Sequence, residues 1–266
     1  MKRAERLAVI GSDQTFVTRS RPDAQLALPT VRIIAHEKND HTHYRKQNYR
    51  CKSCGRQFVR DSQRVDGDTR ALVKKQLLER LSLRGICRVT GLSLTWLLQF
   101  VAALYERLPD GLCLAAASPQ RPVHLLRLEA EVDELWSCVR RRADKQWLWL
   151  AFDKESRRVL AFFVGDRSRE SARELWRRLP AAYRERATFY SDDWEAYKGV
   201  IPAARHVVCG KESGRTSGVE RFNCTLRQRV SRLVRKPLSF SKKLANHIGA
   251  IKYFICHYNR EVIRLV

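Results

Sequence analysis

A run of acidic residues directly after a short apolar segment is the feature that most constrains this chain. Residues 187–190 have the pattern of a buried strand, and Asp192 and Asp193 follow almost at once. Ionised carboxylates are costly to bring together there unless a positive charge lies between them. Asp133 lies within another apolar run, and Glu220 opens a basic, helix-like segment. The pattern predicts three carboxylates at one edge of a sheet, where divalent metal ions would offset their repulsion.

The segments around these acids alternate in a defined order. The expected strands are residues 132–139, 147–152, 159–164, 187–190 and 206–209. The expected helices are residues 169–179, for which Ser168 is the cap, and residues 218–233. Three meandering strands, a crossover helix and two further strands predict an α/β fold with a mixed sheet.

Composition points to a nucleic-acid partner. Of 266 residues, 52 are Lys or Arg and 28 are Asp or Glu, which gives a formal net charge of +24. Such an excess favours nucleic acid over the simpler alternative, a soluble protein with a basic surface. Hydrophobic residues make up 44% of the chain, and no apolar run approaches the roughly 20 residues that span a bilayer. Without a signal-peptide pattern, the eight scattered cysteines are expected to be reduced thiols in the cytoplasm.

Residues 69–106 follow a helical pattern that a turn at residues 90–92 interrupts. Ser93 is a suitable N-cap for the second helix. We expect the buried stripe of that helix to consist of Leu94, Leu97, Leu98 and Val101. Its exposed face would offer Thr95, Trp96 and Gln99 for groove contacts. A short helix, a turn containing glycine and a second helix predict a helix-turn-helix, and an ordinary helical hairpin is the alternative.

Cys51 and Cys54, followed by Gly55 and Phe58, have the spacing of half a zinc ribbon. Two thiolates at one knuckle supply two zinc ligands, and the glycine permits the tight turn. A structural zinc site needs four ligands, so a second pair is expected upstream.

Four motifs in order resemble one known family. They are residues 190–197 (YSDDWEAY), 218–223 (GVERFN), 226–229 (LRQR) and 235–242 (RKPLSFSK). The chain resembles insertion-sequence transposases of the "insertion sequence one" type, which are DDE transposases, over roughly residues 45–258. The resemblance implies a ribonuclease H-like catalytic fold behind zinc-ribbon-like and helix-turn-helix regions.

The resemblance also implies a catalytic triad, namely Asp133, Asp192 and Glu220, which would bind Mg²⁺ or Mn²⁺. Water would first release a 3′-hydroxyl at the element's end, and that hydroxyl would then attack target DNA. Glu134 and Asp193 flank two triad members, but strand alternation directs each to the opposite side and the motif matches Asp192. Taken singly, Asp133 suits a solvent-facing edge strand and Glu220 a first helical turn, where the dipole favours it.

The chain departs from the family pattern at the first half of the ribbon. The family has Cys-Pro-x-Cys where this chain has Leu28, Pro29, Thr30 and Val31. His36, His41 and His43 offer replacements, and the candidate His2Cys2 set is His41, His43, Cys51 and Cys54. We favour a ribbon without Zn²⁺, because a site short of ligands loses most of the folding free energy that the metal supplies.

Residues 221–260 contain ten Lys or Arg and no Asp or Glu. Arg227 lies two helical turns after Glu220 and is expected to hold a phosphate, while Asn223 would orient a water or phosphate. Further backbone contacts are expected from Arg229, Arg232, Arg235 and Lys236. A solvated basic face is the alternative. Phe240, Tyr253 and Phe254 are expected in the core rather than against bases.

The expected organisation has five parts. They are a poorly ordered segment (1–27), a zinc-ribbon-like segment (28–62), a helix-turn-helix region (63–110), a linker (111–125) and a ribonuclease H-like catalytic domain (126–266). The partners would be the terminal repeats of the element and target DNA, bound by a homo-oligomer in a synaptic complex. The expected location is the prokaryotic cytoplasm, at the nucleoid, with no membrane association. Two other functions remain open, a DNA-binding protein that does not transpose (a repressor or decayed copy) and a metal-dependent nuclease.

Overall fold

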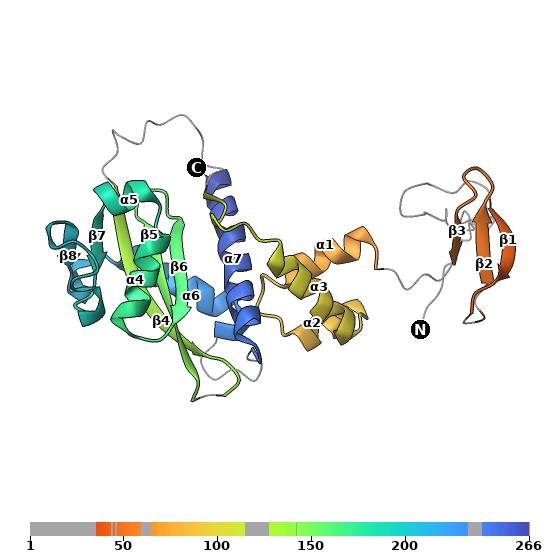
Figure 1. The fold of residues 1–266 in the computed structure, drawn as a ribbon, viewed down its shortest axis with the longest axis horizontal. Helices are drawn as coiled ribbons and strands as arrows, with labels where there is room; N and C mark the ends of the chain where they lie inside the picture. Colours follow the sequence, from red (N-terminus) through yellow and green to blue (C-terminus); the bar gives the residue numbers. More distant parts are fainter. Residues whose placement is uncertain are drawn as a thin grey trace, which may run out of the picture. The chain divides into compact units, whose positions relative to one another are not determined.

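The computed structural model describes residues 36–43, 45, 47–59, 65–114, 128–141, 143–233 and 241–265. The chain divides into two compact units, residues 1–65 and 66–266, which are described separately. Figure 1 traces both along the sequence. The expected segment 1–27, the residues Leu28, Val31, Arg235, Lys236 and Phe240, and most of the linker lie outside the described residues.

The described part of the first unit is a three-stranded antiparallel sheet. Its strands are β1 (His36–His41), β2 (Gln47–Cys51) and β3 (Gln57–Val59), in the order β1-β2-β3. The knuckle after β2 turns at Gly55, which has φ +69° and whose N–H donates to the Cys51 carbonyl at 2.9 Å. The ring of Tyr49 stacks on Phe58 and meets His36 edge-on.

The second unit begins with three short helices around a small core. They are α1 (Gly67–Gln76), α2 (Leu83–Thr90) and α3 (Leu94–Glu106). The predicted turn is present, because Gly91 ends α2 in the left-handed conformation and the Ser93 hydroxyl caps α3. The chain bends by 118° between α2 and α3.

The stripe predicted for α3 is partly wrong. Leu97 and Val101 are buried with Val73 and Ile86, but the Leu98 side chain is 44% exposed. Trp96 was expected on the exposed face, yet it stacks on Phe100 and packs against this core. The reason is that Trp96, Leu97, Phe100 and Val101 follow one side of the helix and together fill this core, so Leu98 lies outside it.

No single helix among the described residues is long and apolar enough to cross a membrane. Together α2 and α3 reach that length and composition only across their bend.

The rest of the unit is built around a five-stranded mixed sheet, as predicted. The strands are β4 (Glu129–Cys138), β5 (Lys145–Asp153), β6 (Val159–Gly165), β7 (Thr188–Ser191) and β8 (His206–Val208). Their order is β6-β5-β4-β7-β8. The first three are antiparallel, whereas β7 pairs parallel to β4 and β8 pairs parallel to β7.

Helices cover both faces of this sheet (Figure 1). On one face lie α4 (Arg169–Arg178) and the short α5 (Ala181–Arg186), which the sequence did not predict. On the other face lie α6 (Ser217–Arg229) and α7 (Leu244–Leu265). Successive residues of β5 alternate between the two cores, as Trp149 faces α4 and Leu150 faces α6 and α7.

The long helix α7 was not predicted as an element, and it connects the sheet to the helical region. Asn259 accepts a hydrogen bond from the Val159 amide at 2.9 Å and donates to the carbonyls of Val159 and Leu112. Phe254 is buried against the sheet, as predicted. On the other side α7 packs against α3, and Figure 1 shows it between the sheet and helices α1–α3.

The contact between α3 and α7 depends on Gly249, because a β-carbon there would overlap the ring of Tyr105. We expect Gly249→Ala to lower the free energy of unfolding by about 1–3 kcal/mol. This loss would exceed the roughly 1 kcal/mol that alanine normally adds in a helix. Urea unfolding measures it, with Gly210→Ala as the control because that position has open space. A Gly249→Ala variant as stable as the native chain would contradict this packing.

Candidate active site

Asp133 lies on the central strand β4 and faces α6. Strand alternation places Glu131 and Asp133 on the α6 side, while Glu134 faces the α4 side. The half-buried Asp133 carboxylate accepts a hydrogen bond at 2.6 Å from the Nδ2 of Asn223, which is on α6. Asn223 was expected to orient a water or phosphate, and in the structure its amide holds an acid of the triad.

Asp192 follows directly after β7, the parallel neighbour of β4. In this pairing Glu131 is opposite Tyr190. Two residues further along each segment are Asp133 and Asp192, so the same register sets these two acids side by side. The Asp192 carboxylate is exposed and accepts a hydrogen bond from the Trp194 amide at 3.3 Å. The strand order therefore brings together two acids that are 59 positions apart in the sequence.

Glu220 occupies the first turn of α6 and is also exposed. The Thr216 hydroxyl donates to its carboxylate at 3.1 Å. Since Asn223 is three residues further along, the same side of α6 that binds Asp133 also carries Glu220.

The three acids are close enough for their charges to interact. Burial, together with the charges of Glu134, Asp192 and Glu220, raises the pKa of Asp133 to about 7. An acid with such a pKa is poorly stabilised as an anion by the protein alone.

The two flanking acids are engaged elsewhere. The Asp193 carboxylate pairs with Lys198 at 3.1 Å. Glu134 pairs with Arg167 at 2.6 Å and accepts a hydrogen bond from the Tyr197 hydroxyl at 3.1 Å. Both side chains already have cations or donors, whereas Asp133 and Asp192 have only neutral donors among the described contacts.

The chemistry of this cluster suits a hard divalent cation. Its oxygen donors are carboxylates, and the amide oxygen of Asn223 is buried without a hydrogen-bond partner in the described part of the chain. No group of three or more His, Cys, Asp or Glu among the described residues is already arranged to hold a metal ion. The side chains fit Mg²⁺ or Mn²⁺ in type, and binding would have to draw them closer together.

Sequence reasoning missed a residue that positions α6. Glu131 is buried, and its carboxylate accepts a hydrogen bond from the Val219 amide at 2.7 Å. Burial raises the pKa of Glu131, and hydrogen bonds from the Val219 and Gly218 amides counter that rise. No side chain of the residue before α6 caps this helix, so Glu131 performs that role from β4.

Gly218 allows this approach, because a β-carbon there would lie 2.9 Å from both Glu131 carboxylate oxygens. Glu131 precedes Asp133 by two residues, and Gly218 precedes Glu220 by two. The contact therefore fixes the helix that carries one acid against the strand that carries another. A buried acid at the same alternation phase as Asp133 was the available sequence signal.

The predicted DNA-contacting residues have varied surroundings. Thr95 and Gln99 are exposed on α3. Arg227 is half-buried on α6. Arg229 pairs with Glu79 at 2.7 Å and lies over the Phe254 ring. Arg232 donates to the Ser241 hydroxyl at 2.9 Å, so Arg229 and Arg232 both have partners within the protein.

The ribbon sheet does not assemble the candidate His2Cys2 set. His36 is opposite Cys51, while His41 is opposite Gln47 at the other end of the hairpin. The four residue steps of β2 from Gln47 to Cys51 span about 13 Å, too far for one metal ion. At the knuckle, hydrogen bonds from the Ser53 hydroxyl and the Cys54 backbone lower the pKa of Cys51 to about 7.

The cap on α6 can be tested by replacing the Glu131 carboxylate. We expect Glu131→Ala to lower the free energy of unfolding by about 1–3 kcal/mol, because the Val219 amide at the start of α6 loses its buried acceptor. Glu129→Ala is the control on the same strand, since its partly exposed carboxylate instead pairs with Lys154 and accepts a hydrogen bond from the Tyr190 hydroxyl at 3.0 Å. Urea unfolding and amide exchange at Val219 measure the effect. Equal losses in the two variants would contradict the special role of Glu131.

The raised pKa of Asp133 predicts a pH dependence of stability. Its carboxyl titrates at about 7 in the folded chain against an ordinary 3.8, so between these values the folded state holds a proton that the unfolded chain has lost. The contribution of Asp133 to the free energy of unfolding is therefore fully present below about pH 4 and is lost as the pH rises to 7. The loss is at most about 1.4 kcal/mol per pH unit.

Asp133→Asn removes this titration. We expect the variant to gain stability relative to the native chain as the pH rises from 4 to 7 in metal-free buffer. Urea unfolding of both proteins across that range measures the difference. Parallel curves would show that Asp133 has an ordinary pKa.

Comparison with known proteins assigns the sheet region to a family. The IS1 transposase family model matches residues 127–259, which is half of the chain. The insertion element iso-IS1n protein InsB of Shigella dysenteriae is 38% identical over 130 residues, covering 49% of this chain and 95% of that protein. The IS1 protein InsB of Shigella flexneri is 34% identical, covering 48% and 96%. The IS1 4 protein InsB of Escherichia coli K12 is 32% identical, covering 48% and 75%. This chain belongs to the IS1 transposase family.

Proposed function

We propose that this chain is a DNA transposase that cuts the ends of its insertion element and transfers the resulting 3′-hydroxyl into target DNA. The observation that carries the proposal is the arrangement of three acids, with Asp133 on β4, Asp192 directly after the neighbouring strand β7, and Glu220 in the first turn of α6, which packs on the same sheet. Family membership supports a transposase, and the net charge of +24 supports DNA as the partner.

The fold proposed for the catalytic domain is ribonuclease H-like. It is supported by the order β6-β5-β4-β7-β8, with an antiparallel meander followed by two parallel strands. Helices on both faces leave the end of β7 and the start of α6 at the edge where the acids meet. We also propose that α2 and α3 act as a helix-turn-helix that reads DNA, with Thr95 and Gln99 toward the groove.

Asp133, Asp192 and Glu220 are the residues that would hold the divalent cation. When bound, Mg²⁺ or Mn²⁺ would supply charge stabilisation for phosphoryl transfer and activate the attacking oxygen. Asn223 would keep the Asp133 carboxylate oriented, and Glu131 would hold α6 in place against β4. The pair of Glu134 with Arg167 would keep a fourth carboxylate on the α4 side of the sheet, opposite the side that Asp133 faces.

Matched carboxamide variants test the assignment. A nicking and strand-joining assay would use supercoiled DNA that carries the sequences flanking the coding region, with Mg²⁺ or Mn²⁺. We expect Asp192→Asn and Glu220→Gln to lower the rate at least about 100-fold, because each removes a charge that the transition state requires. Asp193→Asn is the control, since that carboxylate pairs with Lys198.

The alternatives predict other outcomes. A native chain that binds these DNA ends but neither nicks nor joins them is a DNA-binding protein that does not transpose. Nicking without joined products indicates a nuclease. Equal losses in Asp192→Asn and Asp193→Asn would contradict the choice of Asp192.

A further inference from the structure

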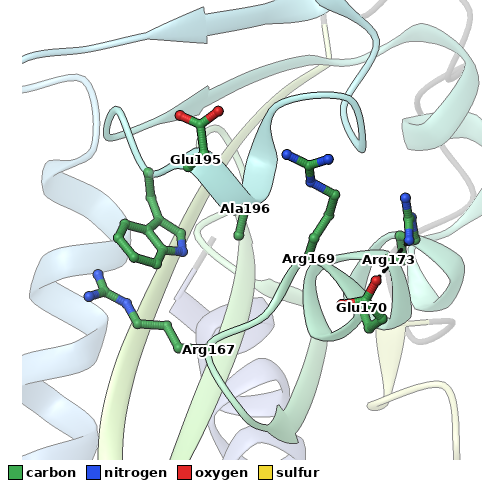
Figure 2. Close-up of a pocket in the computed structure, with 7 residues that line it drawn as sticks. Arg167, Arg169, Glu170, Arg173, Glu195 and Ala196 are labelled. Atoms are coloured by element: carbon green, nitrogen blue, oxygen red, sulfur yellow. Dashed lines mark hydrogen bonds and ion pairs between the residues drawn. The ribbon is translucent and has the colours of Figure 1, made fainter.

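A pocket of about 380 Å³ lies between the start of α4 and the turn after β7 (Figure 2). Three arginines line it, Arg167, Arg169 and Arg173, together with Trp194 and two acids, Glu170 and Glu195. Figure 2 shows Arg169 extending from α4 toward the turn that contains Ala196. None of these arginines was among the DNA contacts that the sequence suggested.

One wall of the pocket is firmly built. The Arg167 guanidinium lies between two indole rings, 4.5 Å from the centroid of Trp147 and 3.7 Å from that of Trp194. It also donates to Glu134 at 2.6 Å. Such stacking and pairing hold a long side chain in a single orientation.

The start of α4 forms the opposite wall. The Asp166 carboxylate accepts hydrogen bonds from the hydroxyls of Ser168 and Ser171 at 2.6 and 2.5 Å, which fixes the first turn. Arg169 and Arg173 are four residues apart on this helix and therefore lie on the same side.

The charges of the pocket leave one cation without a partner. Glu170 pairs with Arg173 at 3.0 Å, and Glu195 pairs with Lys198 at 3.1 Å. Arg167 pairs with Glu134. The exposed Arg169 side chain makes no ion pair or hydrogen bond with any residue that the structure describes. An anion in the pocket would give Arg169 a partner without competing with a carboxylate already bound there.

Two residues that line the pocket are linked to the carboxylate edge. Trp194 is two residues after Asp192, and Arg167 binds Glu134, the residue next to Asp133. A DNA strand whose scissile phosphate is at the three acids would therefore pass this pocket within a short distance. The planar guanidinium fork suits phosphate oxygens, and the volume exceeds that of one phosphate, which leaves room for the adjoining sugar.

We propose that this pocket binds a backbone phosphate of the DNA strand that is cut, with Arg169 as the principal contact. The proposal rests on the proposed function, since it takes the strand to be positioned at Asp133, Asp192 and Glu220. It adds a contact on the α4 side of the sheet to the basic surface expected on the α6 side.

The salt dependence of DNA binding tests the contact. The full chain would bind a duplex that carries an element end, in a chelator so that no cleavage occurs. Because each neutralised phosphate contributes about 0.9 to the logarithmic salt slope, Arg169→Ala should reduce the slope by about that amount and weaken binding about tenfold. Arg177→Ala is the control, since it removes the same charge from α4 outside the pocket, where the side chain is 68% exposed.

A scan with single methylphosphonates then locates the phosphate. One neutral substitution near the scissile bond should weaken binding by the native and Arg177→Ala chains, yet weaken Arg169→Ala no further. If Arg169→Ala and Arg177→Ala change the slope equally, or every methylphosphonate acts alike on all three proteins, the pocket is not a phosphate site. Strand joining by the native chain with no Arg169-dependent phosphate would reject the pocket and keep the function. An Arg169-dependent phosphate without any cleavage would keep the pocket as a phosphate site and reject the proposed transposase activity.

Discussion

The hydrogen bonds from the start of α6 to the buried Glu131 carboxylate are the contact on which the candidate site depends. Without them α6 would begin with uncapped amides beside a buried acid, and Glu220 would have no fixed relation to β4. Gly218 is the sequence's contribution to this contact, because any side chain there would displace the carboxylate. The contact with Glu131 thus both caps α6 and fixes the position of Glu220. The two residues that form it, Glu131 and Val219, are 88 positions apart in the sequence.

This arrangement brings several carboxylates close together, and only some of them have cationic partners. Glu134 and Asp193 have cationic partners, Arg167 and Lys198. Asp133 has no cationic partner among the described contacts, and burial together with the charges of the neighbouring acids raises its pKa to about 7. The acids with cationic partners are the sequence neighbours of those without, so the negative charge at the sheet edge is left unbalanced at Asp133 and Asp192. A hard cation would relieve that imbalance without rearranging the surrounding pairs.

Much of the sheet was predictable from the sequence, because apolar runs and turn residues mark β4 to β8 and α4 within a few positions. The acids of the site were also predictable, since a carboxylate at the end of a buried strand is conspicuous. The contacts between distant residues were not. Nothing local indicates that Glu131 reaches Val219, or that Arg167 lies between Trp147 and Trp194. In α3 the predicted stripe included both Leu97 and Leu98, and only the packing against Val73 and Ile86 shows that Leu97 is buried and Leu98 is exposed. The ribbon histidines depended on a hairpin register that spacing alone does not supply.

The position of α7 has a consequence for how the two proposed DNA-binding regions work together. One side of this helix is buried against the sheet, and the other packs on α3. The helix that would read the DNA sequence and the edge that would cut it are therefore attached to a common rigid rod. With such a connection the number of base pairs between the recognised sequence and the cut would be set by the fold of the chain. An element could then change its terminal sequence through α3 alone, but it could change the position of its cut only by altering α7.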